Sequence, residues 1–106
     1  MKLVADADRF DAWQSFFICD MMEIMKRHLE EAHLPAAQVR DLTEKLAFSI
    51  ACAIDGSQSV EVDGVELNPI LTFAPGGDEL IHCGGNSYMH EYVFGISDEI
   101  FGESGA

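Results

Sequence analysis

The spacing of apolar residues changes at Asp55-Gly56, and this change most constrains what the chain can fold into. Before it, apolar residues recur every three or four positions, as in helices that bury one side. After it, they alternate with polar residues in short runs interrupted by Gly and Pro, as in strands joined by turns. The 106 residues, 48% of them apolar, suit a single domain over 1–106 with one core. The sequence therefore predicts an α+β fold.

Two helices are predicted in the first half of the chain, over residues 6–34 and 35–55. Asp6 or Asp8 can cap the orphan N–H groups at the start of the first helix. Pro35 suits the first turn of the second helix and would break the interior of the first. The two helices should therefore form an N-terminal helical hairpin.

Each predicted helix carries an apolar stripe that is expected to face the core. The stripe of the first helix comprises Phe10, Trp13, Phe17, Met21, Ile24, Met25, His28 and Ala32. The stripe of the second helix comprises Val39, Leu42, Leu46, Ala47, Ile50, Ala53 and Ile54. His28 is expected at the end of the first stripe, bonded to a loop carbonyl. A pH switch or a ligand role is the alternative for this residue.

The clearest local signal is the segment Val60 to Leu67, with the sequence VEVDGVEL. Asp63-Gly64 between two alternating runs predicts a hairpin with a type I′ turn. In that register the four apolar side chains share one face, which is expected to be buried. Glu61 lies opposite Glu66 on the other face, which should show bare carboxylates to solvent.

Two further strands are predicted at 70–73 and 79–83, which gives an antiparallel sheet of about four strands over residues 59–83. The following segment, 87–101, fits either a strand or a helix, and a short helical segment is the preferred interpretation. Gly95 is expected to break it, and Ser97 to restart it as a cap. Residues 102–106 should be a frayed tail.

Charge is distributed unevenly along the chain, which has 19 acids, 6 bases and a formal net charge of −13. Lys45 is the last Lys or Arg. This balance argues against direct binding to nucleic acid or anionic lipid, because both require clustered cations. It favours a protein partner with a basic surface.

The segment at the N-terminus has no apolar signal core, and the chain has no apolar run long enough to span a membrane. Its three cysteines show no paired spacing, which favours reduced thiols over a disulfide framework. The sequence therefore predicts a cytoplasmic protein that does not enter a membrane.

Carboxylates on the predicted hairpin and on the next turn are the first candidate binding surface. They are Glu61, Asp63, Glu66, Asp78 and Glu79. If they form one field, they would steer a basic partner and raise its association rate. The alternative is a solvated face that binds nothing.

The first helix supplies a second candidate surface, because it has apolar residues outside its main stripe. They are Phe16, Cys19 and Met22. A helix that is apolar nearly all round is usually buried on two sides. The second side is predicted to contact another protein or a second copy of the chain, which would give a homodimer. Coverage by the C-terminal segment is the alternative.

His82, Cys83 and His90 are the residue types that bind zinc or form a Cys–His nucleophile. Their spacing matches no recognised pattern, and His82 and Cys83 should point to opposite faces of a strand. A surface His and a buried thiol are the preferred interpretation. The sequence also lacks a P-loop, an EF-hand loop and a hydrolase elbow. We therefore predict no catalytic, cofactor-binding or metal-binding residue.

Together these patterns predict a small acidic protein-binding domain that is not an enzyme. An inhibitor, an immunity-type protein or an adaptor that blocks a cationic partner is the most specific form of this hypothesis. One alternative is a metal-binding or thiol-dependent enzyme that uses His82 or Cys83 with His90. A second alternative is an obligate homodimer with a structural role.

Overall fold

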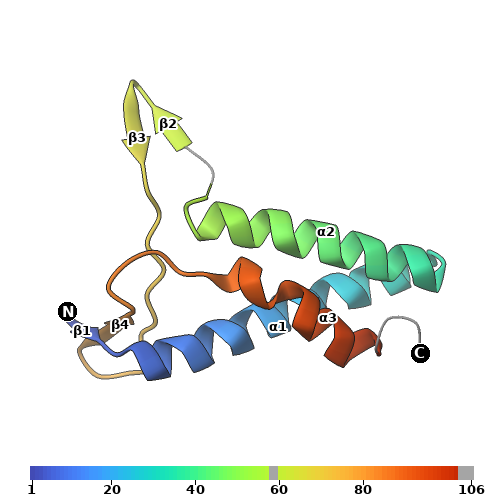
Figure 1. Ribbon diagram of the computed structural model, residues 1–106, viewed down its shortest axis with the longest axis horizontal. Helices are drawn as coiled ribbons and strands as arrows, with labels where there is room; N and C mark the ends of the chain where they lie inside the picture. Colours follow the sequence, from blue (N-terminus) through green and yellow to red (C-terminus); the bar gives the residue numbers. More distant parts are fainter. Residues whose placement is uncertain (58–59, 103–106) are drawn as a thin grey trace.

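The structure, a computed structural model, describes residues 1–57 and 60–102. The elements are β1 (Lys2–Ala5), α1 (Ala7–Glu31), α2 (Ala36–Ile54), β2 (Val60–Val62), β3 (Val65–Leu67), β4 (Glu79–His82), the 3₁₀ helix η1 (Met89–Tyr92) and α3 (Val93–Phe101). Figure 1 shows α1 and α2 as an antiparallel pair, with α3 beside them. The predicted helical hairpin and C-terminal helical segment are confirmed. None of the described helices is both long and apolar enough to cross a bilayer.

Helix α1 begins at the predicted cap, because the Asp6 carboxylate accepts a hydrogen bond of 3.1 Å from the backbone N–H of Arg9. This bond, together with the Arg9 side chain, lowers the pKa of Asp6. Helix α2 ends before Gly56, which has a φ of 78°. A Cβ at this position would lie 2.4 Å from side-chain atoms of Asn68 and Asn86. Glycine is therefore required at position 56 for two reasons: its backbone is left-handed, and a side chain there would clash with the neighbouring loops.

The core lies where α1, α2 and the η1–α3 segment meet. Its buried residues are Ile18, Met22, Ala47, Ala51, Met89, Val93 and Ile96. The buried positions on α1 are Phe10, Gln14, Ile18 and Met22, and those on α2 are Val39, Thr43, Ala47 and Ala51. Both helices are therefore rotated about their axes relative to the predicted stripes.

Residues that were predicted to face the core are consequently on the surface. Phe17, Ile24, Leu46 and Ile50 are 37% to 46% exposed. His28 is exposed as well, and its Nδ1 lies 3.6 Å from a carboxylate oxygen of Glu31, not against a loop carbonyl. The stripes were misplaced because both helices are apolar on more than one side, so periodicity permits several orientations.

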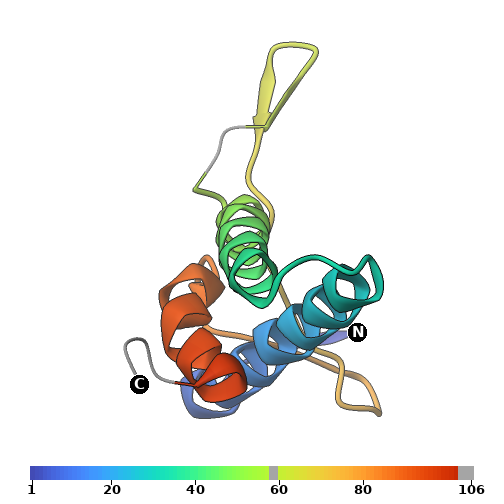
Figure 2. The ribbon, with the colours of Figure 1, turned by 90° about the vertical axis from the view of Figure 1, so that its right-hand side faces the viewer.

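The β2–β3 hairpin has the predicted register, with Val60 opposite Leu67 and Glu61 opposite Glu66. Asp63 and Gly64 have φ values of 52° and 79°, as a type I′ turn requires. The hairpin packs against no other helix or strand of the described chain, and Figure 2 shows it projecting from the helices. Its four apolar side chains are 45% to 57% exposed, so the prediction that they are buried is wrong.

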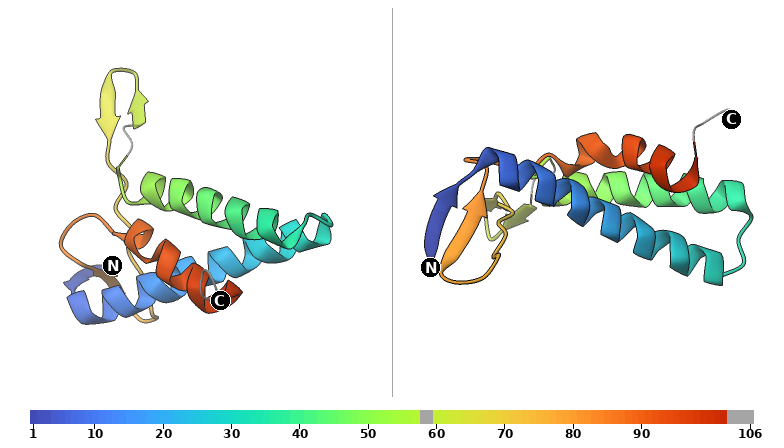
Figure 3. Two further views of the ribbon diagram at one scale, coloured as in Figure 1. Left: turned by 45° about the vertical axis from the view of Figure 1, so that its right-hand side comes forward. Right: turned by 90° about the horizontal axis from the view of Figure 1, so that it is seen from below.

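The predicted four-stranded antiparallel sheet does not form. Strand β4 instead pairs in parallel with β1, from Lys2 opposite Glu79 to Ala5 opposite His82. Figure 3 shows these two strands side by side at the end of the molecule where α1 begins. The segment predicted as a strand at 70–73 contributes one antiparallel bridge, between Phe73 and Ile81.

Helix α3 runs through Gly95 without the predicted break. Ser97 is buried inside the helix, and its hydroxyl donates a hydrogen bond of 2.6 Å to Glu44 on α2 instead of capping a new helix. Tertiary packing therefore overrides the local cap signal. Of the predicted tail at 102–106, only Gly102 lies within the described residues.

An aromatic cluster attaches the 70–74 segment to α1. The ring of Phe73 lies 5.3 Å from that of Phe10, and 6.0 Å from the rings of Trp13 and Phe17. These centroid distances are typical of favourable tilted and edge-to-face aromatic pairs. Phe73 therefore anchors the link between the hairpin and β4 on the first half of α1.

Candidate functional site

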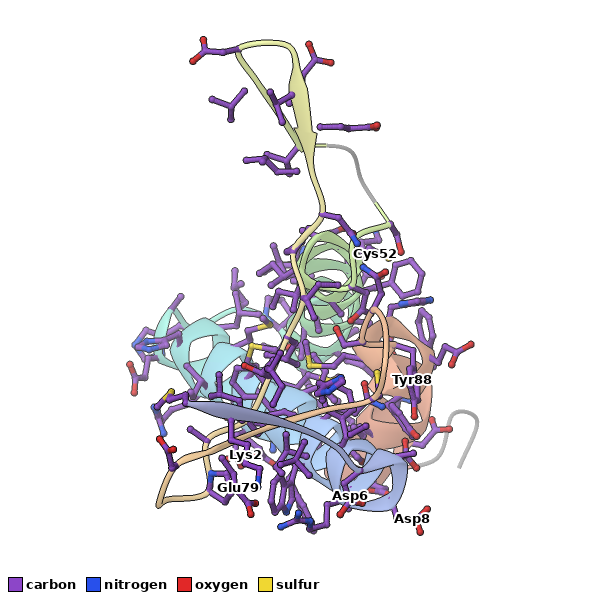
Figure 4. The ribbon with its side chains drawn as sticks, turned by 90° about the vertical axis from the view of Figure 1, so that its left-hand side faces the viewer. Lys2, Asp6, Asp8, Cys52, Glu79 and Tyr88 are labelled. Carbon is purple, nitrogen blue, oxygen red and sulfur yellow. The ribbon has the colours of Figure 1, made fainter. Side chains whose placement is uncertain are left out.

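The five carboxylates predicted to form one field lie in two separate places. Glu61, Asp63 and Glu66 are on the projecting hairpin, whereas Asp78 and Glu79 are at the β1–β4 end. Figure 4 shows Glu79 beside Lys2 at one end of the view and the hairpin at the other. The prediction of a single acidic surface is therefore not met by the described structure.

The two carboxylates at the β1–β4 end have cationic neighbours. Asp78 lies 3.7 Å from the N-terminal ammonium of Met1, and Glu79 lies 3.7 Å from the guanidinium of Arg9. Cations of the first half also reach the last helix, where Arg40 binds Asp98 at 2.7 Å. The fold therefore brings cations to part of the second half, and the hairpin keeps its carboxylates away from this end of the molecule.

The three residues predicted as a contact surface on α1 have different environments. Phe16 is 69% exposed, Cys19 is partly buried against the core, and Met22 is fully buried. Burial raises the pKa of the Cys19 thiol, and nearby carboxylates, including Glu99 of α3, raise it further. The C-terminal segment thus covers this side of α1, and only Phe16 remains available to a partner.

The opposite apolar side of the helices is not covered by α3, and the 70–74 segment packs on part of it, through the contact between Phe73 and Phe17. We call it the open face, and it consists of Phe17, Ile24, Leu46, Ile50 and Ile70, which are 37% to 47% exposed. The apolar hairpin face consists of Val60, Val62, Val65 and Leu67. Sequence reasoning found these residues but placed all of them, except Ile70, in the core.

Asp55 is the centre of a buried polar cluster that sequence reasoning missed. Its carboxylate accepts hydrogen bonds from the Ser87 hydroxyl at 2.6 Å and from the backbone N–H of His90 at 2.9 Å. The His90 ring nitrogen Nδ1 lies 2.6 Å from the same carboxylate. Because an ionised carboxylate only accepts, we assign the proton to Nδ1.

The bonds to Asp55 determine its ionisation. Burial raises the pKa of the Asp55 carboxyl, but the hydrogen bonds from Ser87 and His90 outweigh burial and hold its pKa below the usual range. Tyr88, at the cap position of η1, makes no side-chain capping bond. Asp55 therefore supplies a capping carboxylate to η1 from a distant part of the chain.

This cluster resembles the acid–imidazole pair of a catalytic triad only in part. In a triad the hydroxyl donates to the imidazole, which can then remove its proton. Here the Ser87 hydroxyl donates to Asp55 instead. The His90 ring also contacts the ring of Phe48 of α2, which is edge-on to it at a centroid distance of 5.9 Å. The arrangement fixes η1 against α2.

His82 and Cys83 form no hydrogen bond to His90 within the described residues. The Nδ1 of His82 accepts a hydrogen bond of 3.0 Å from the N–H of Gly84. The Sγ of Cys83 lies 3.4 Å from the carbonyl oxygen of Asn86. In the part of the chain that the structure describes, no three His, Cys, Asp or Glu side chains are grouped so as to hold a metal ion.

A second, partly buried contact joins α1 to η1. The hydroxyl of Tyr92 donates a hydrogen bond to the carboxylate of Asp11. This bond lowers the pKa of Asp11 and, with burial, raises the pKa of Tyr92 to about 12. The pair has the same role as Asp55, because it holds the C-terminal segment on the helical hairpin.

Comparison with protein-family models, with curated proteins and with solved structures finds nothing that matches this chain. A pocket of ≈ 400 Å³ lies at the α1–α2 turn and is lined in part by Glu30, His33 and Phe101. Helix α2 separates it from Asp55 and His90 by roughly 28 Å, since a helix rises 1.5 Å per residue. The polar cluster therefore lies outside this pocket. Among the surfaces described above, the projecting hairpin is the strongest candidate for a functional surface.

Proposed function

We propose that this chain is a non-enzymatic domain that binds another protein through the acidic face of its β2–β3 hairpin. The observation that carries the proposal is the position of this hairpin. It projects from the helices, packs on no other described helix or strand, and carries Glu61 and Glu66 on one face with Asp63 at its tip. A projecting element can enter a cleft of a partner without moving the rest of the domain.

The chemistry of the hairpin favours a partner with a basic surface. The sequence contains no Lys or Arg after Lys45, so no cation lies within the hairpin itself. The negative charge of the hairpin carboxylates would attract a basic cleft over several ångströms and raise the rate of association at low salt. An inhibitor, an immunity-type protein or an adaptor in a reducing cytoplasm fits this role, and the three free cysteines are consistent with such a compartment.

The variant E61K/D63K/E66K is expected to slow association with a basic partner by about 10-fold to 100-fold at low salt, because it reverses the local potential. The partner would first be captured from a lysate of the source cells at low and at high salt. Association rates of the purified pair would then be measured by surface plasmon resonance over a range of salt concentrations.

A matched control reverses three carboxylates elsewhere on the surface. Asp20, Glu30 and Glu91 are exposed and lie outside the hairpin, so D20K/E30K/E91K makes the same change in net charge. The control should slow association much less than the hairpin variant. Equal rates for the wild type and the hairpin variant at low salt would rule out the acidic face as the binding surface.

A further inference from the structure

We infer that a second copy of this chain covers the open face and the apolar hairpin face, so that the protein is a two-fold symmetric dimer. This inference goes beyond the proposed function, because it concerns the opposite face of the hairpin. The acidic face of each hairpin would stay in water and remain available to a basic partner.

The amount of apolar surface is the first argument. The nine side chains of the two faces are 37% to 57% exposed, and none of them is charged. Nine side chains exposed to this extent supply an area of the same order as the roughly 800 Å² that each partner buries in a standard interface. Monomers rarely leave a continuous apolar surface of this size in water.

The side chains of the open face on α2 and α1 point the same way. Leu46 and Ile50 each lie two residues from Phe48, which packs on Phe94 of α3 at 5.8 Å. Two residues turn a helix by about 200°, so both side chains point away from α3. Phe17 lies two residues before Cys19, which is near Glu99 of α3, and the same reasoning turns Phe17 away from α3.

The two helices also bring these residues to matching heights. Phe17 on α1 and Ile50 on α2 are equally far from the α1–α2 turn, and Ile24 and Leu46 are both nearer to it. Because α1 and α2 are antiparallel neighbours, the four side chains lie on the same side of the helix pair, the side opposite α3. Figure 2 shows that α3 packs on only one side of this helix pair.

The apolar hairpin face continues the open face on the same side. In Figure 4, below the tip of the hairpin, the side chains that carry red carboxylate oxygens extend towards the side of α3. The side chains without oxygen extend to the other side. Ile70 lies shortly after Leu67 in the chain and is 47% exposed, which links the two faces. A single flat partner surface could therefore cover both.

The chemistry of this surface favours a second copy as its occupant. A two-fold interface places the same patch against itself, so an uncharged apolar patch needs no complementary charge on the partner. The carboxylates of Glu61 and Glu66 are turned away from it, which limits repulsion between two chains of net charge −13. A second copy would also support the hairpin, since an isolated two-stranded hairpin is at best marginally stable in water.

Sedimentation equilibrium over a range of protein concentrations tests the inference. The wild type should show the mass of a dimer, and added salt should strengthen the dimer by screening the repulsion between the copies. The variant I50E/V65E should weaken dimerisation by roughly 100-fold or more, because it buries two unpaired charges. Binding of a basic partner should respond oppositely to salt, so the two proposals can fail separately.

The matched control is L3E/F16E, which places two Glu residues at exposed apolar positions outside both faces. Leu3 and Phe16 are 66% and 69% exposed. This control should remain a dimer. A wild type that stays monomeric at all concentrations overturns the inference, even if a different protein binds this surface. A dimer that I50E/V65E leaves intact overturns the assignment of these faces.

Hydrogen exchange of the wild type gives a second test that needs no variant. The backbone amides of β2 and β3 should exchange more slowly at high protein concentration than at low concentration, because dimerisation covers the hairpin. Amides of the α1–α2 turn should show no such dependence. Exchange in the hairpin that does not depend on concentration, across a range in which the mass changes, would place the interface elsewhere.

Discussion

Replacement of Asp55 by Ala is expected to lower the free energy of unfolding by about 3 kcal/mol, because it removes the acceptor of several buried hydrogen bonds. The buried Ser87 hydroxyl and the partly buried backbone N–H of His90 would lose their partner. Helix η1 would also lose its capping carboxylate. Urea denaturation followed by circular dichroism measures the change.

The variant Asp41→Ala is the matched control for this prediction. Asp41 pairs with Lys45 at 2.9 Å, but the two side chains are 58% and 72% exposed. The control should therefore change stability by less than about 0.5 kcal/mol. A loss at Asp55 no larger than the loss at Asp41 would show that the buried cluster is unimportant for folding.

The Asp55 carboxylate also makes the free energy of unfolding depend on pH, and the sign of this dependence follows from its pKa. The pKa of Asp55 is lower in the folded protein than the value of about 3.9 in an unfolded chain. Its contribution to stability is therefore complete above the unfolded pKa and is lost as the pH falls through the folded pKa. The pKa of Asp11 is lowered as well and acts in the same direction. Asp55→Asn should flatten the acid side of the stability profile relative to the wild type.

Replacement of Phe73 by Ala should lower the free energy of unfolding by about 3 kcal/mol, within the range for large aromatic residues. The ring contacts Phe10, Trp13 and Phe17, and its loss would leave a gap between the 70–74 segment and α1. The backbone bridge to Ile81 does not require the ring, so the β4 pairing should survive. Urea denaturation followed by the fluorescence of the single tryptophan reports this change directly.

The control for Phe73 is Phe16→Ala, which removes the same ring from an exposed position on α1. Its effect should stay within about 0.5 kcal/mol. The intermediate variant Phe73→Leu keeps part of the volume and should fall between the two. If all three proteins unfold at the same urea concentration, the aromatic cluster does not anchor this segment.

Features with local causes were predictable from the sequence. The hairpin register follows from Asp63-Gly64 and the alternation on either side of it, because the turn type fixes which residues pair. The cap at Asp6 and the left-handed Gly56 depend on the chain within one helical turn. These elements were predicted because the residues that determine them are neighbours in the sequence.

Features that join distant segments were not predictable in the same way. The parallel pairing of β1 with β4 joins residues 2–5 to residues 79–82, and neither segment by itself indicates its partner. Ser87 and His90 reach Asp55 across 32 and 35 residues. No local pattern marks such a pair, because the residues next to each one in the sequence are typical of an ordinary loop or helix end.

The sequence by itself determined two helices, one tight hairpin, a helical C-terminal segment and the acidity of the second half. Only the tertiary structure decided which sides of α1 and α2 are buried. Both helices carry apolar residues around much of their circumference, so several rotations bury similar areas. The position of α3, fixed by Asp55, Tyr92 and Arg40, selects one rotation and leaves the open face on the side away from α3. Several rotations of each helix would bury similar apolar areas, and contacts between distant residues determine which rotation is adopted.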